Sequence, residues 1–129
     1  MNYPFIPKST SHLEPGQYWP IPLSNGRYGC GVVLAKLQRD GKSETRVFYA
    51  GLLQWCSKLQ PNADTIKNCG FVKKGALHIK AIISIGSEIT GKADFKDFPP
   101  NPSEYTYDIV TMGYDVINIV AEKQFAAGS

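Results

Sequence analysis

The alternation of apolar and polar side chains predicts short β-strands in the first half of the chain. Apolar positions gather at 17–23, 27–37 and 45–53, and the dipeptides Asn25-Gly26 and Asp40-Gly41 separate these segments. Asn-Gly and Asp-Gly favour tight hairpins because both residues tolerate the positive φ of a type I′ turn. The pattern therefore predicts a three-strand antiparallel meander with hairpins at these two dipeptides.

Prolines and glycines modify the first two of these strands. Pro20 and Pro22 cannot donate ladder hydrogen bonds, so they restrict the first strand to a sheet edge or to interrupted pairing. Gly29 and Gly31 allow a bulge, or the close approach of another group to the backbone. The run 32–34 is apolar on both faces of its strand, which predicts that this part of the sheet is covered on both sides.

The second half of the chain carries weaker signals. Asn62 is suited to cap one helical turn at 62–66. Segment 75–85 alternates, which predicts a strand with Leu77, Ile79, Ala81, Ile83 and Ile85 toward the core and Ile82 outward or toward a covering loop. Two further strands are predicted at 105–111 and 114–120. Segment 86–103 is polar, rich in proline and irregular.

These elements predict a mainly β protein: an antiparallel, strongly curved sheet or a partial, SH3-like barrel with little helix. The organisation expected is a flexible lead-in at 1–15, a single β-rich domain at 16–122 and a flexible tail at 123–129. The residues expected to be largely buried lie on the apolar strands: Trp19, Val32, Leu34, Val47, Leu77, Ile79 and Ile83.

Composition narrows the classes of function. The chain has 129 residues, 43% of them hydrophobic and 12% aromatic, which is typical of a globular domain. The net charge of +3 is too small to indicate nucleic-acid binding, and Lys73-Lys74 is expected in a solvated turn. The first residues lack the charged start and apolar run of a signal peptide, so we expect a cytoplasmic protein without a membrane partner.

The residues able to carry chemistry are few and dispersed. Cys30, Cys56 and Cys69 are odd in number and lack metal-binding spacing, so we expect free thiols. Cys30 is expected to be buried as a small apolar residue, and His78 to be a surface or structural residue. His12 has no Ser or Cys partner that the sequence ties to it. We therefore expect no catalytic, cofactor or metal site, and a protein that is not an enzyme.

One stretch resembles a known family. Ile21-Pro22-Leu23, Asn25-Gly26, Tyr28 and Gly31-x-Val33 are similar to the opening hairpin of the immunity protein 26 family of bacterial polymorphic toxin systems. Gln17 stands where that family commonly has an acidic residue, and Pro20 is not typical of it. The resemblance implies a mostly β cytoplasmic protein that neutralises a cognate toxin protein by direct binding, and it carries over no catalytic or ligand residue.

The best candidate for a working surface is the segment from Lys92 to Tyr107, since long loops held by a rigid scaffold often carry binding residues. It combines aromatic side chains, which supply contact area, with carboxylates that would attract a basic partner. The residues predicted to bind are Asp94, Phe95, Asp97, Phe98, Glu104, Tyr105 and Asp108. The structural alternative is a loop that packs its own aromatic side chains onto the sheet.

A second function stays open at this point. A small Tudor-like or SH3-like barrel would bind a nucleic acid or a peptide. Basic residues on the predicted meander, with Tyr28, Phe48 and Tyr49 nearby, suit that alternative. The basic residues are Arg27, Lys36, Arg39, Lys42 and Arg46. The oligomeric state is not indicated by the sequence.

Overall fold

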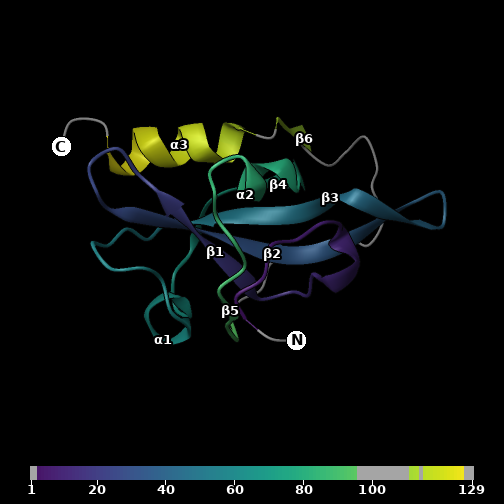
Figure 1. The fold of residues 1–129 in the computed structure, drawn as a ribbon, viewed down its shortest axis with the longest axis horizontal. Coiled ribbons are helices and arrows are strands. Elements are labelled where there is room, and N and C mark those ends of the chain that lie inside the picture. The colour runs from purple at the N-terminus through teal and green to yellow at the C-terminus, as the bar shows by residue number, and fades with distance from the viewer. Residues whose placement is uncertain (1–2, 96–110, 114, 127–129) are drawn as a thin grey trace.

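The computed structural model describes residues 3–95, 111–113 and 115–126. Strands β1 (Gln17–Pro22), β2 (Tyr28–Arg39) and β3 (Lys42–Leu53) form the predicted meander, and β4 (Phe71–His78) adds a fourth long strand (Figure 1). Two-residue strands, β5 (Gly91–Lys92) and β6 (Thr111–Met112), give the order β5-β1-β2-β3-β4-β6. The sheet stays open, and its described pairings are antiparallel except β4 with β6. The mainly β, curved-sheet prediction is confirmed.

Both hairpins form at the predicted dipeptides, with different turns. Asp40 and Gly41 have φ values of 54° and 78°, the two positive values expected of a type I′ turn. At the first hairpin Gly26 has φ 81°, but Asn25 is not among the positive-φ residues described. The Leu23 N–H donates to the Arg27 carbonyl at 2.9 Å. This loop has three residues, so the type I′ prediction is wrong there; the Asn25 side chain accepts the Arg27 N–H at 3.1 Å.

The two prolines of β1 act as predicted. β5 pairs only with Gln17 and Tyr18, so the pairing on the outer edge of β1 stops before Pro20. Beyond that point the Ser87 Oγ donates to the Pro20 carbonyl at 2.6 Å. The prediction of interrupted pairing is confirmed.

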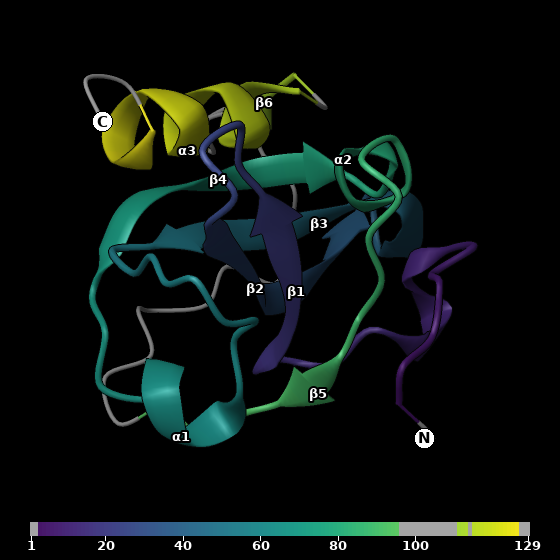
Figure 2. The ribbon, with the colours of Figure 1, turned by 60° about the vertical axis from the view of Figure 1, so that its left-hand side comes forward.

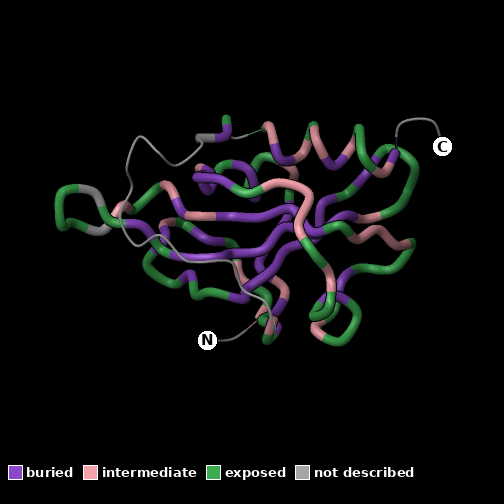
Figure 3. The backbone as a smooth tube through the Cα atoms, turned by 180° about the vertical axis from the view of Figure 1, so that it is seen from behind, coloured by how far each residue is buried: buried purple, intermediate pink, exposed green. Residues whose placement is uncertain are grey.

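Both faces of the sheet are covered. Side chains of α2 (Lys80–Ile83) and α3 (Val116–Phe125) pack into one core cluster, which holds Val33, whereas α1 (Ala63–Ile66) lies on the opposite face (Figure 2). Val32 and Leu34 belong to the cluster on the α1 face. Successive residues of a strand point to opposite faces, so 32–34 contribute to both cores. Buried positions follow the central strands in Figure 3, and the two-sided burial of 32–34 is confirmed.

The predicted strand at 75–85 is wrong beyond His78. β4 begins earlier, at Phe71, and includes Lys73-Lys74, which do not form the expected turn. After His78 the chain enters α2, so the side chains no longer alternate: Ile82 is fully buried and Ile83 is 43% exposed. Tertiary packing overrides the β preference of the isoleucines here, because Ala81 and Ile82 fill the core beside α3.

The strand predicted at 114–120 is also wrong, because Val116–Phe125 is the helix α3. Ile117 and Ala121 are four residues apart and both are fully buried, as expected for one face of a helix. This face lies over Gly29 of β2, where a Cβ would be in ordinary contact, 3.7 Å from the Ala121 Cβ. As in α2, tertiary packing outweighs the strand preference of the β-branched residues in this segment.

Most of the predicted core is confirmed. Trp19, Val32, Leu34, Leu77 and Ile79 are buried, whereas Val47 is half-buried and Ile83 is exposed.

The segment expected to be a flexible lead-in contacts the rest of the fold. Phe5 forms a bridge with Ile89, Leu13 is fully buried, and a short 3₁₀ helix η1 spans Thr10–His12. At the other end, α3 continues into the predicted tail as far as Phe125.

Among the described residues, none of the helices combines the length and the apolar composition needed to cross a membrane.

Candidate functional site: the groove between α1 and β5

A groove of about 550 Å³ lies where α1 meets β5. We call it the α1–β5 groove. Its lining combines two small side chains with two carboxylates, two ammonium groups and an amide. The residues that line it are Ala63, Asp64, Lys67, Asn68, Lys92, Ala93 and Asp94.

The α1 wall is held by a capping box, as the predicted Asn62 cap suggests. The Asn62 side chain accepts N–H groups of Asp64 and Thr65 at 3.0 and 3.1 Å, and the Thr65 Oγ1 accepts the Asn62 N–H at 3.2 Å. Ile66 is fully buried and anchors the turn to the sheet. A weak surface ion pair joins Lys67 to Asp64 at 3.9 Å, so neither charge is fixed by it.

The β5 wall is held by backbone hydrogen bonds. The Ala93 N–H donates to the Gly16 carbonyl at 3.0 Å. Gly16 has φ 98°, and a Cβ there would lie 2.5 Å from the Ala93 carbonyl oxygen, so this close approach requires glycine. Asp94 follows directly and is exposed. The charged side chains on both walls are therefore attached to backbone that is held in place by hydrogen bonds.

Tyr18 lies beneath β5 and is 5% exposed. Its ring packs over Gly91, where a Cβ would lie 2.4 Å from the phenol oxygen. Burial raises the pKa of Tyr18, with a smaller contribution from Cys30, while a hydrogen bond from the Ala63 backbone opposes the shift. Tyr18 therefore stays neutral at physiological pH, and the charge of the groove comes from its exposed side chains.

The structure places two of the seven predicted binding residues. Asp94 lies on the groove wall, and Phe95 is half-buried with its ring centroid 6.3 Å from that of Phe71. For Phe95 the structure therefore agrees with the alternative interpretation, in which the aromatic side chains of this segment pack onto the sheet. The other five, Asp97, Phe98, Glu104, Tyr105 and Asp108, lie outside the described residues.

Sequence reasoning missed the α1 half of the groove. Asp64, Lys67 and Asn68 are more than twenty positions from Asp94 and come beside it through tertiary packing. The Asn62 cap predicts the helical turn, but no signal in the chain tells which strand the turn will face.

Among the side chains considered for catalysis, those of His78, Cys30 and Cys69 are hydrogen-bonded within the fold or buried in it. The His78 Nδ1 accepts the Lys80 N–H at 3.0 Å, where β4 ends. Cys30 is fully buried, and burial raises the pKa of its thiol well above the usual range, with Cys69 adding to the shift. Burial also raises the pKa of Cys69. Both thiols are therefore protonated, and weakly nucleophilic, near neutral pH.

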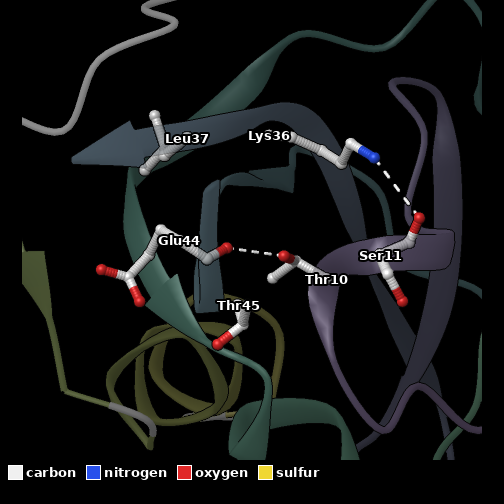
Figure 4. Close-up of a pocket in the computed structure, with 6 residues that line it drawn as sticks. All are labelled: Thr10, Ser11, Lys36, Leu37, Glu44 and Thr45. Atoms are coloured by element: carbon white, nitrogen blue, oxygen red, sulfur yellow. Dashed lines mark hydrogen bonds between the residues drawn. The ribbon is translucent and has the colours of Figure 1, made fainter. Parts of the chain in front are cut away.

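A second, smaller hollow of about 190 Å³ lies between η1 and the β2–β3 hairpin (Figure 4). The Thr10 Oγ1 donates to the Glu44 carbonyl at 2.6 Å, and the Lys36 Nζ donates to the Ser11 carbonyl at 3.3 Å. The Arg46 guanidinium similarly donates to the Lys8 carbonyl at 3.0 Å. These polar groups hold the N-terminal segment against the sheet, so we interpret this hollow as a structural seam.

Three of the residues that suit the nucleic-acid alternative have structural roles. Two of its basic residues, Lys36 and Arg46, bind backbone carbonyls, and Phe48 is fully buried against Trp19. Stacking on bases requires exposed aromatic faces.

Comparison with protein-family models, with curated proteins and with solved structures finds no match for this chain. In the part of the chain that the structure describes, no three His, Cys, Asp or Glu side chains gather in a way that could hold a metal ion. The α1–β5 groove offers hydrogen-bond donors, acceptors and charges of both signs, which suit recognition of another polar surface.

Proposed function

We propose that this protein is a cytoplasmic bacterial immunity protein that neutralises a cognate toxin by direct, non-catalytic contact, with the α1–β5 groove as part of the contact surface. One observation carries the choice of surface. Asp94 is exposed between two fixed points, the Ala93–Gly16 hydrogen bond and the Phe95–Phe71 ring contact. A charge held on a rigid scaffold is suited to steering and binding a partner without an ordering cost.

Two further features support the proposal. The segment predicted to bind begins at this groove, and α1 adds Asp64 to the carboxylate of Asp94. The hairpin at 21–33 resembles the immunity protein 26 family in its sequence. An inhibitor needs a complementary surface and no reactive group, which fits the structural surroundings of Cys30 and His78.

The direct test is neutralisation in cells. The toxin encoded beside this gene is expressed in a host bacterium with or without the protein. The proposal predicts that growth stops with the toxin alone and resumes with both. If the adjacent product does not arrest growth, or if it arrests growth equally in both strains, the proposal is wrong.

A charge reversal then tests the surface. Asp94→Lys is compared with Asp115→Lys, which makes the same charge change at the start of α3, on the opposite face (Figure 2). For a basic toxin, we expect Asp94→Lys to lower the association rate about five- to tenfold at low salt, as is typical of interface charges. Asp115→Lys should change it little. Equal rates for both variants would remove the groove from the interface.

A further inference from the structure

A pocket of about 210 Å³ lies at the outer edge of β1, beyond the point where β5 stops pairing. We call it the β1-edge pocket. Its walls include Pro22, Tyr28, Gln60 and Glu88. Pro22 and Tyr28 both belong to the hairpin stretch singled out in the sequence, and nothing in the α1–β5 groove uses them.

We propose that the β1-edge pocket receives the guanidinium group of an arginine side chain on a protein partner. The inference rests on the proposed function only in taking the partner to be a protein.

Several polar groups that line the pocket can accept a hydrogen bond. Pro22 and Tyr28 are register partners, but the Tyr28 N–H and carbonyl bond with Ser57 on the other side. The Pro22 carbonyl therefore faces the outer edge, on the same side as the Pro20 carbonyl, which accepts the Ser87 hydroxyl. Among the described residues, no hydrogen bond reaches the Pro22 carbonyl and no ion pair reaches the Glu88 carboxylate.

An added peptide strand does not fit this edge. Strand addition needs alternating N–H and carbonyl groups, and Pro20 and Pro22 have no N–H to offer. The volume of about 210 Å³ is also below the roughly 300–1,000 Å³ of small-molecule sites. A single side chain is the occupant that remains.

Arginine matches the chemistry of the walls. The Glu88 carboxylate, the Pro22 carbonyl and the Gln60 amide oxygen are acceptors that a guanidinium, with five N–H donors, can bind together. Tyr28 lies on the same face of the sheet as Pro22 and offers an aromatic side chain, on which a guanidinium stacks favourably. Among the residues that the structure describes, no Lys or Arg lines the pocket to compete for these groups.

The test is an NMR titration of the ¹⁵N-labelled protein with N-acetyl-L-arginine amide. We expect saturable shifts of the Ser87, Glu88 and Thr90 amide signals, with a dissociation constant of about 1–10 mM, the range of a single side chain. The neutral citrulline analogue should not bind, and N-acetyl-L-lysine amide should bind several-fold more weakly. Shifts that do not saturate, or equal binding of the citrulline or lysine compound, would overturn the proposal.

Variants locate the binding. Glu88→Gln keeps the shape of the side chain and should weaken arginine binding about tenfold or more. Asp40→Asn makes the same charge change in the β2–β3 turn, where φ 54° suits Asn, and should leave binding unchanged. Tyr28→Leu should also weaken it, with the thermal midpoint confirming the fold. Unchanged binding in Glu88→Gln would refute the assignment. Because no toxin is present in the titration, its failure would leave neutralisation untouched.

Discussion

Glu122 of α3 accepts two hydrogen bonds from Ser24 in the β1–β2 turn, from the backbone N–H at 2.6 Å and from Oγ at 2.7 Å. The Asn25 side chain extends the contact by donating to the Phe125 carbonyl at 3.3 Å. The turn of the hairpin therefore binds the C-terminal end of α3 in addition to the core contacts of Ile117 and Ala121.

This contact predicts an acid-sensitive contribution to stability. The hydrogen bonds from the Ser24 side chain and backbone lower the pKa of Glu122 below its ordinary 4.5. Because the folded-state pKa is the lower one, the contribution is present above pH 4.5 and is lost as the pH falls through the depressed value. In urea unfolding, the difference in unfolding free energy between the native protein and Glu122→Gln should be larger at pH 7 than at pH 3. An equal difference at both values would contradict this.

Neighbouring isoleucines of α2 give a matched pair. Ile82 is fully buried, so Ile82→Ala should lower the free energy of unfolding by about 2–4 kcal/mol. Ile83 is 43% exposed, and Ile83→Ala should change it by less than about 0.5 kcal/mol. Urea denaturation of both variants measures the contrast. A larger loss of stability for Ile83→Ala than for Ile82→Ala would contradict the helix α2 and favour the strand predicted from the sequence.

Two glycines test the packing of the largest core side chain. A Cβ at Gly31 would lie 2.2 Å from the indole ring of Trp19, which is fully buried and cannot move aside. Gly31→Ala should therefore cost about 2–3 kcal/mol of stability through overpacking. Gly70→Ala meets nothing within 4 Å and should stay within about 0.5 kcal/mol. Thermal or urea unfolding measures the difference. Similar stabilities of the two variants would show that Trp19 does not pack against Gly31.

The thiols should differ in reactivity. All three cysteines are free, Cys30 is fully buried, and Cys56 and Cys69 are half-buried. Burial keeps the Cys30 thiol protonated and inaccessible, so iodoacetamide should modify Cys56 and Cys69 first in the native protein. After denaturation all three should be modified, as peptide mass spectrometry would show. Early modification of Cys30 would contradict its placement in the core.

The sequence predicts the local features of this fold well. Asn25-Gly26, Asp40-Gly41 and the Asn62 cap act through their own backbone, so their positions can be read from a few residues. The helix at Val116–Phe125 and the turn at Lys80–Ile83 could not be predicted, since their β-branched residues favour strands locally and only packing against the sheet makes them helical.

The same limit applies to the candidate site. Asp94 stands out in the sequence because it begins a polar, proline-rich segment. Its neighbours Asp64 and Lys67 depend on where α1 settles on the sheet, and the β1-edge pocket depends on the register between Pro22 and Tyr28. Both are long-range relationships without a local signature.

Neutralisation by binding can be measured by titrating a fixed amount of the toxin encoded beside this gene with the purified protein and following the residual toxin activity. At concentrations well above the dissociation constant, a binding inhibitor must be present in stoichiometric amounts. We expect toxin activity to fall in proportion to added protein and to reach its minimum at a fixed molar ratio, with no further change over time. Complete inactivation by a small fraction of an equivalent, progressing with time, would show that the protein acts catalytically and not as a binding inhibitor.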